Sequence, residues 1–128
     1  MMSKNTLQSA AEVRFARSEL NDNAGVCVLI DGIQIAVFHL PDETPALYAL
    51  HNWDPLGKAN VLYRGIVGDL NGELVVASPL YKQHFSLHTG RCVEEDVCVP
   101  VYEVWLEDDI VVVALRASNP TAQERMSA

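Results

Sequence analysis

Short runs of apolar residues, separated by polar turns, recur along most of the chain. Asp31-Gly32 and Asn71-Gly72 each stand between two such runs. The runs cover residues 26–30 and 33–38 around the first pair, and residues 65–70 and 73–77 around the second. Asp-Gly and Asn-Gly pairs between β-branched runs are typical of two-residue hairpin turns, because both turn positions favour positive φ. The pattern therefore predicts two β-hairpins.

The rest of the apolar pattern also predicts short strands. They are expected at residues 13–16, 47–50, 85–87 and 91–93, and a third hairpin is expected to join 102–106 to 110–115. No segment has the period of a long amphipathic helix. About nine short strands, with a turn roughly every eight to twelve residues, are typical of a sandwich or a barrel. We therefore expect an all-β fold of short antiparallel strands that form packed sheets or an incomplete barrel.

A single domain is expected over residues 11–116. The chain has 128 residues, of which 49% are apolar and 20% charged, and this composition is typical of a globular protein. Residues 1–10 have a weak pattern and are expected to form a flexible N-terminal segment. Residues 117–128 are expected to form a polar C-terminal tail. We find no internal repeat and no linker.

Charge and hydropathy exclude two classes of partner. A net charge of −8 with only nine Lys and Arg residues argues against nucleic acid, because phosphate binding needs clustered cations. No segment approaches the roughly 18 apolar residues of a membrane span, and the N-terminus lacks a signal-peptide pattern. Three cysteines without a secretory signal are expected to be reduced thiols. We therefore expect a cytoplasmic protein that binds neither nucleic acid nor membrane.

The common catalytic and metal-binding motifs are missing from the sequence. It contains no G-x-S-x-G, no Gly-rich phosphate loop, no H-E-x-x-H and no Cys-x-x-Cys. His84, His88 and Cys92 could converge around the turn at Thr89-Gly90, but their spacing matches no zinc pattern. Exposed loop histidines beside a buried Cys92 are the favoured interpretation. No catalytic residue, no metal ligand and no direct small-molecule substrate is predicted.

Three further residues are interpreted from their place in the pattern. Cys27 lies inside an apolar strand and is expected in the core. His39 closes a strand just before Pro41 and is expected at the surface. His51 lies at a loop, as His84 does, and both are candidates for contact with a partner or a cofactor.

Two segments, 47–57 and 75–90, each run as a strand followed by a polar loop that contains proline. The second reads x-x-P-L-x-x-x-x-F-x-x-x-x-G, ending at Phe85 and Gly90. This arrangement resembles the Rieske ferredoxin domain over residues 12–115, nearly the whole chain. In that family each loop supplies one Cys and one His to a [2Fe–2S] cluster. The resemblance implies a Rieske-like all-β fold.

The four ligand positions depart from the Rieske pattern. Against the first motif, Cys-x-His, the chain has Asp54 and Leu56. Against the second, Cys-x-x-His, it has Ser78 and Tyr81. Asp54 offers at most an oxygen donor, and Leu56 cannot coordinate a metal. The comparison therefore implies a domain without its cluster.

One branch of this superfamily matches the departures as well. Residues 64–69 and 75–85 look like the small subunit of assimilatory NAD(P)H-dependent nitrite reductase, and so do residues 52–55 and 59–62. The resemblance implies a large-subunit partner that carries FAD, a [4Fe–4S] cluster and sirohaem, and that reduces nitrite to ammonium. It also implies that the small subunit is needed with the large one, has no redox centre and is not catalytic alone.

Apolar and aromatic residues gather on the two loops. They are Trp53, Pro55, Leu56, Pro79, Leu80 and Tyr81, with Lys82, Gln83 and His84 as a polar rim. Such residues favour docking on the large subunit, and they also fit loops that pack on each other in place of a cluster. A Rieske-type [2Fe–2S] electron carrier and a free-standing binding module with this fold are the alternative functions.

Overall fold

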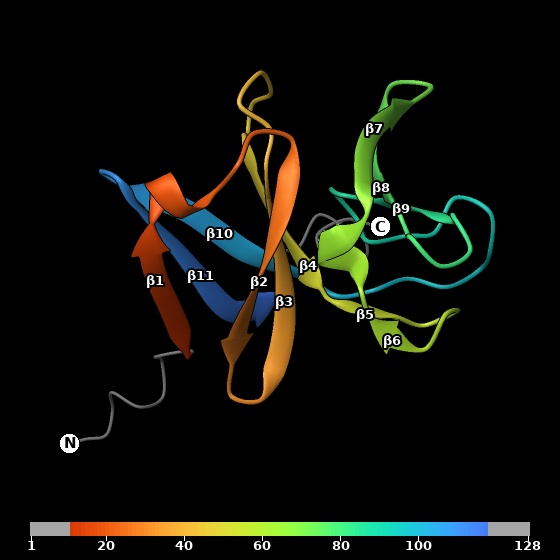
Figure 1. Ribbon diagram of the computed structural model, residues 1–128, viewed down its shortest axis with the longest axis horizontal. Coiled ribbons are helices and arrows are strands. Elements are labelled where there is room, and N and C mark those ends of the chain that lie inside the picture. Colours follow the sequence, from red (N-terminus) through yellow and green to blue (C-terminus); the bar gives the residue numbers. More distant parts are fainter. Residues whose placement is uncertain (1–10, 118–128) are drawn as a thin grey trace, which may run out of the picture.

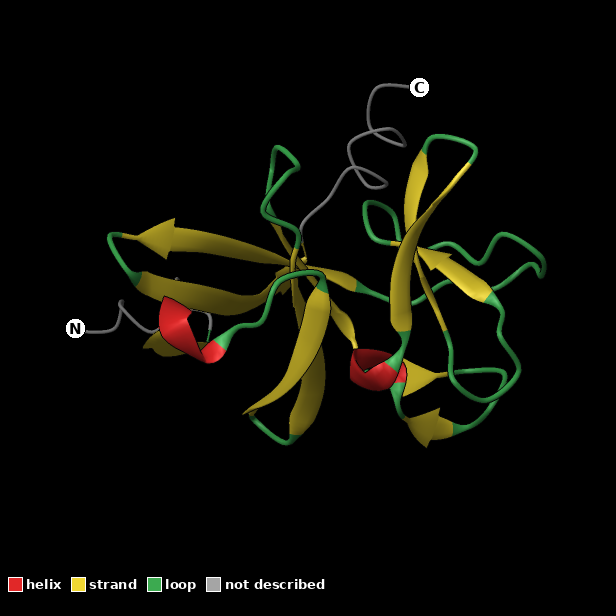
Figure 2. Cartoon of the chain, turned by 45° about the horizontal axis from the view of Figure 1, so that its top comes forward, coloured by secondary structure: helices red, strands yellow, loops and turns green. Residues whose placement is uncertain are grey.

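Strands dominate the described part of the chain, residues 11–117, in the computed structural model (Figures 1 and 2). The strands are β1 (Glu12–Ala16), β2 (Ala24–Ile30), β3 (Ile33–His39), β4 (Leu47–His51), β5 (Trp53–Asp54), β6 (Ala59–Asn60), β7 (Ile66–Leu70), β8 (Glu73–Ala77), β9 (His84–Ser86), β10 (Val101–Glu107) and β11 (Ile110–Ala117). Two 3-10 helices, η1 (Arg17–Glu19) and η2 (Leu62–Arg64), complete the described elements. The predicted all-β fold is confirmed.

The strands form one large sheet and two small ones. The large sheet has the order β1-β11-β10-β4-β3-β2, and its outer strands β1 and β2 come into contact, so that it curls into an incomplete barrel. The small sheets, β7-β8-β9 and β5-β6, lie together at the other end of the molecule from β1 (Figure 1). The end with the small sheets carries both proline-containing loops, one between β5 and β6 and the other between β8 and β9.

Strand β3 separates the core of the barrel from the core beneath the small sheets. Ile35 and Val37 point into the barrel core, whereas Ala36 and Phe38 point into the core beneath the small sheets. Because successive side chains of a strand face opposite sides, a strand that separates two cores must be apolar at nearly every position. This requirement explains the continuous apolar run that the sequence shows there.

The three predicted hairpins are confirmed. Asp31-Gly32 turns β2 into β3 with φ values of 49° and 80°, and Asn71-Gly72 turns β7 into β8 with φ values of 56° and 90°. In the third hairpin the strand continues to Glu107, which pairs with Ile110. Only Asp108 and Asp109 are left in that turn, rather than the three acidic residues expected.

Other expectations need correction. Residues 53–54 and 59–60 form a small β-ladder that the apolar pattern does not reveal, because two-residue strands carry no periodic signal. Residues 91–93 form no strand of their own and pair only through isolated bridges, Phe85 with Cys92 and Arg91 with Cys98. The segments predicted for 1–10 and 118–128 lie outside the described residues. Within 11–117, no helix has the length and hydropathy needed to cross a membrane.

Candidate functional site

Asp54 organises the first loop, which joins β5 to β6. Its side chain is fully buried, and Oδ1 accepts hydrogen bonds from the backbone N–H groups of Leu56 at 2.8 Å and Gly57 at 3.0 Å. Its backbone oxygen accepts the N–H of Lys58 at 2.6 Å, which closes the loop. The carboxylate is therefore turned inward and is already bonded within the protein.

Ser78 organises the second loop, which joins β8 to β9, in the same way. It is buried, and its N–H donates to the carbonyl oxygen of Gln83 at 2.9 Å. Its own carbonyl oxygen accepts the N–H of Lys82 at 3.0 Å, and its hydroxyl accepts the N–H of Leu80 at 3.3 Å. Each loop is thus closed on the residue at its first position.

A direct hydrogen bond joins the two loops. Ser78 Oγ donates to Asp54 Oδ2 at 2.5 Å, between buried side chains. Gly57 and Leu80 make the second contact, because a Cβ placed on Gly57 would overlap Cδ1 of Leu80. Only glycine allows this approach. The two loops therefore form one packed unit.

The two loops also share a short sequence that the sequence analysis missed. Residues 54–58 read Asp-Pro-Leu-Gly-Lys and residues 78–82 read Ser-Pro-Leu-Tyr-Lys. Both end on a lysine in the left-handed region, Lys58 with φ 59° and Lys82 with φ 63°. The repeated Pro-Leu-x-Lys was the available signal, and it is too short to register as an internal repeat.

The donor atoms at the four positions matched to Rieske ligands do not suit a [2Fe–2S] cluster. Such a cluster takes two thiolates and two imidazoles. Asp54 and Ser78 have their oxygens engaged with each other, and Leu56 has no donor atom. Tyr81 is 66% exposed and presents a phenol, which is not a ligand of this cluster type.

The predicted docking residues divide into two groups. Trp53, Leu80 and Tyr81 are exposed large apolar side chains, with exposed fractions of 38%, 44% and 66%. Pro79 and Lys82 are exposed beside them. Pro55, Leu56, Gln83 and His84 are half-buried, and Leu56 packs against the core beneath the small sheets. We call Trp53, Leu80 and Tyr81 the loop tip.

His84 is held by Glu94 rather than aimed at the loop tip. Its Nδ1 lies 2.6 Å from Glu94 Oε2, and its backbone N–H donates to Oε1 at 2.8 Å. Partial burial acts to raise the pKa of Glu94, but the hydrogen bonds from His84 outweigh it and hold that pKa below its usual value. Cys92 Sγ donates to the same carboxylate at 3.7 Å, and burial raises the pKa of this thiol.

The histidines and cysteines do not assemble a metal site in the part of the chain that the structure describes. No three His, Cys, Asp or Glu side chains between residues 11 and 117 converge as metal ligands would. His88 is exposed and meets the ring of Tyr48 edge-on, at 5.3 Å between ring centroids. Cys92 is buried and His88 exposed, as predicted, whereas His84 is half-buried rather than exposed.

Asn52, just before the first loop, is a buried polar residue that the sequence analysis passed over. Its Oδ1 accepts the N–H of Tyr63 at 2.8 Å, and its Nδ2 donates to Gln34 Oε1 at 3.1 Å. These bonds tie β3 to helix η2 under the loop. The neighbouring His51 is half-buried, and burial lowers its pKa below 6.5.

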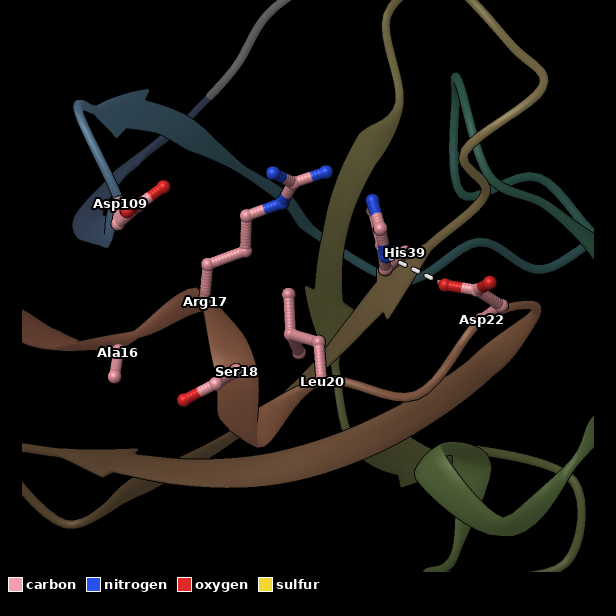
Figure 3. A pocket seen from close by; sticks show the side chains of 7 residues that line it. All are labelled: Ala16, Arg17, Ser18, Leu20, Asp22, His39 and Asp109. Carbon is pink, nitrogen blue, oxygen red and sulfur yellow. Dashed lines mark ion pairs between the residues drawn. The ribbon is translucent and has the colours of Figure 1, made fainter.

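Two expectations about single residues are wrong. Cys27 is exposed, because it lies on the outward side of the edge strand β2. His39 is buried, only 5% exposed, with its Nδ1 3.4 Å from Asp22 Oδ1. It lines a pocket of about 410 Å³ with Arg17 and Asp109, shown in Figure 3. This pocket lies on the barrel side of the molecule and takes no part in the paired loops.

Comparison with known proteins identifies the family of this chain. Residues 14–114 match the family of Rieske-like [2Fe-2S] domains. The small subunit of NADH nitrite reductase from Salmonella typhimurium is 43% identical over 88 residues, which cover 68% of this chain and 81% of that protein. The solution structure of the nitrite reductase [NAD(P)H] small subunit from Erwinia carotovora has a TM-score of 0.66 and 35% identity, and the match covers 87% of this chain and 83% of that one.

A further match joins this domain to a different polypeptide. Part of the nitrite reductase [NAD(P)H] large subunit of Klebsiella oxytoca is 47% identical to this chain over 68 residues, which cover 53% of this chain and only 7% of that protein. A segment similar to this domain is therefore built into a protein of that name. Together with the match over residues 14–114, these relatives show that the chain belongs to the Rieske-like domain family and, within it, to the small subunits of NAD(P)H nitrite reductase.

Proposed function

We propose that this chain is the non-catalytic small subunit of a cytoplasmic, assimilatory nitrite reductase that reduces nitrite to ammonium with NAD(P)H. The observation that carries the proposal is the buried hydrogen bond between Ser78 and Asp54, in a chain that belongs to the nitrite reductase small subunits. Asp54 and Ser78 stand at positions that the sequence comparison matches to Rieske cluster ligands, and their bond to each other supports a domain that holds no cluster. The chain acts through its partner and takes no small-molecule substrate itself.

In this proposal the redox centres belong to the large subunit. FAD, sirohaem and a [4Fe–4S] cluster are assigned there, and none is assigned to this chain. The inward-turned Asp54 and the aliphatic Leu56 support this division, because neither can replace a thiolate or an imidazole. The same donor chemistry argues against a Rieske-type electron carrier.

The loop tip is proposed to dock on the large subunit. Trp53, Leu80 and Tyr81 expose apolar surface on two loops that the buried Ser78 to Asp54 hydrogen bond holds together. Aromatic side chains on a rigid support are enriched at protein interfaces. The similar segment within the Klebsiella oxytoca large subunit supports an arrangement in which this domain works in contact with that chain, rather than as a free-standing binding module.

Reconstitution of the large subunit with and without this chain tests the proposal. Nitrite reduction is measured separately from NAD(P)H oxidation by an artificial electron acceptor. We expect nitrite reduction to require this chain, and this chain alone to reduce no nitrite. Full nitrite reduction by the large subunit alone would contradict the proposed role.

A further inference from the structure

The two loops each expose one charged side chain, and both of these side chains are lysines. Across residues 53–60 and 78–83, Asp54 is the only acidic residue, and its carboxylate is buried. Lys58 and Lys82 are exposed, and neither makes an ion pair within residues 11–117. In a chain with a net charge of −8, the two loops thus carry two exposed lysines and no exposed acidic side chain of their own.

Several cations elsewhere in the chain are neutralised by acids. Arg14 pairs with Glu107 at 2.9 Å, and Arg116 pairs with Glu103 at 2.7 Å. Arg91 lies 3.6 Å from Asp96. These side chains serve contacts within the protein, whereas the two loop lysines extend into solvent beside the loop tip.

The backbone conformation of the two lysines is the second observation. Six non-glycine residues in the described range have positive φ: Asn23, Asp31, Lys58, Asn71, Lys82 and Asp108. Four of them are Asn or Asp, which tolerate the left-handed region because their short polar side chains bond to the local backbone. Lysine has no such compensation. Two lysines at equivalent positions of two similar loops are therefore poor choices for local stability, and strain of this kind clusters at functional sites.

We propose that Lys58 and Lys82 form a cationic pair that binds carboxylates on an acidic surface of the large subunit, on either side of the contact made by the loop tip. This inference rests on the proposed docking function and adds the chemistry of the partner surface. Each lysine N–H closes its loop on Asp54 or Ser78, and those two side chains are bonded to each other. The backbone positions of the two lysines are thereby coupled to the same buried bond that joins the two loops.

The test compares two double variants in titrations with the purified large subunit. K58N/K82N removes both charges and supplies a residue suited to positive φ, whereas K58R/K82R keeps both charges. We expect K58N/K82N to bind about three- to tenfold more weakly at low salt, and its affinity to depend less on salt than that of the unmodified chain. Its Tm should be no lower than that of the unmodified chain. K58R/K82R should keep the affinity and the salt dependence.

Two controls separate this inference from the docking proposal. R17N removes an exposed cation from the barrel side of the molecule and should leave the affinity unchanged. W53E/Y81E disrupts the loop tip itself. W53E/Y81E could lose binding while K58N/K82N keeps the affinity and salt dependence of the unmodified chain. In that case the proposed role of the two lysines is wrong and the docking proposal stands. If the unmodified chain does not bind the large subunit, both fail.

Discussion

Ser78 and Asp54 lie 24 positions apart in the sequence and meet through a buried hydrogen bond of 2.5 Å. Asp54 also holds two backbone N–H groups of its own loop. One carboxylate thus fixes the first loop and ties it to the second. The function proposed for the loop tip depends on this rigidity, because a preorganised surface loses less conformational entropy when it binds.

Removal of this carboxylate should destabilise the domain. Asp54→Ala leaves the buried hydroxyl of Ser78 and two half-buried backbone N–H groups without an acceptor, and we expect a loss of about 2–4 kcal/mol in the free energy of unfolding, measured with urea. Asp69→Ala is the matched control, because that carboxylate also caps a backbone N–H but is exposed. It should cost less than about 1 kcal/mol. Equal losses in the two variants would show that the buried bond is not a main support of the loops.

Substitution of the buried Asn52 should also lower the free energy of unfolding. Asn52→Ala removes the acceptor of the Tyr63 N–H and the donor to Gln34 under the first loop. We expect a loss of about 2–4 kcal/mol in unfolding free energy, whereas Asn60→Ala, at an exposed position of β6, should stay within about 0.5 kcal/mol. A loss for Asn52→Ala as small as that for Asn60→Ala would contradict the assignment.

Substitutions at Gly90 and Gly72 compare the cost of a steric overlap with the cost of backbone strain alone. Both have positive φ, 77° and 90°, but a Cβ on Gly90 would overlap the carbonyl oxygen of Val99, whereas one on Gly72 would meet nothing within 4 Å. Gly72→Ala should cost only the strain, about 1–2 kcal/mol. Gly90→Ala should cost clearly more, because its neighbour is backbone and cannot turn away. Thermal unfolding of both variants under identical conditions gives the comparison, and equal Tm values would refute it.

Much of the fold could be predicted from the sequence because its signals are local. Asp31-Gly32 and Asn71-Gly72 specify their hairpins through the φ preferences of the turn residues. The burial of His39 and the exposure of Cys27 could not be predicted, because both depend on which side of its strand faces a second layer. A strand pattern alone does not contain that information.

The candidate site was predictable in location but not in detail. The proline-containing loops were expected to lie side by side, and the Ser78 to Asp54 bond confirms that they do, whereas partner contacts at these loops remain a proposal. That Asp54 turns inward to Ser78, while Lys58 turns into solvent, follows from long-range packing across 24 residues. No local periodicity encodes such a contact.

The stability of the domain should fall on mild acidification, in part through His51. Burial lowers the pKa of His51 below 6.5, so the unfolded chain binds this proton more readily than the folded one. Unfolding free energy should therefore decrease as pH falls below about 6.5, and His51→Gln should flatten that decrease. An unchanged slope in His51→Gln, measured by urea unfolding between pH 5 and 7.5 or so, would refute this assignment.

The most direct test of the central claim is co-purification of the large subunit with loop-tip variants. W53E/Y81E places charge on the loop tip, and Leu29→Glu places it on an apolar residue of β2 in the barrel that is 63% exposed, close to the 66% of Tyr81. Circular dichroism and Tm establish that each variant is folded. The account predicts that W53E/Y81E loses the large subunit while Leu29→Glu retains it. Retention of the large subunit by folded W53E/Y81E would contradict the account.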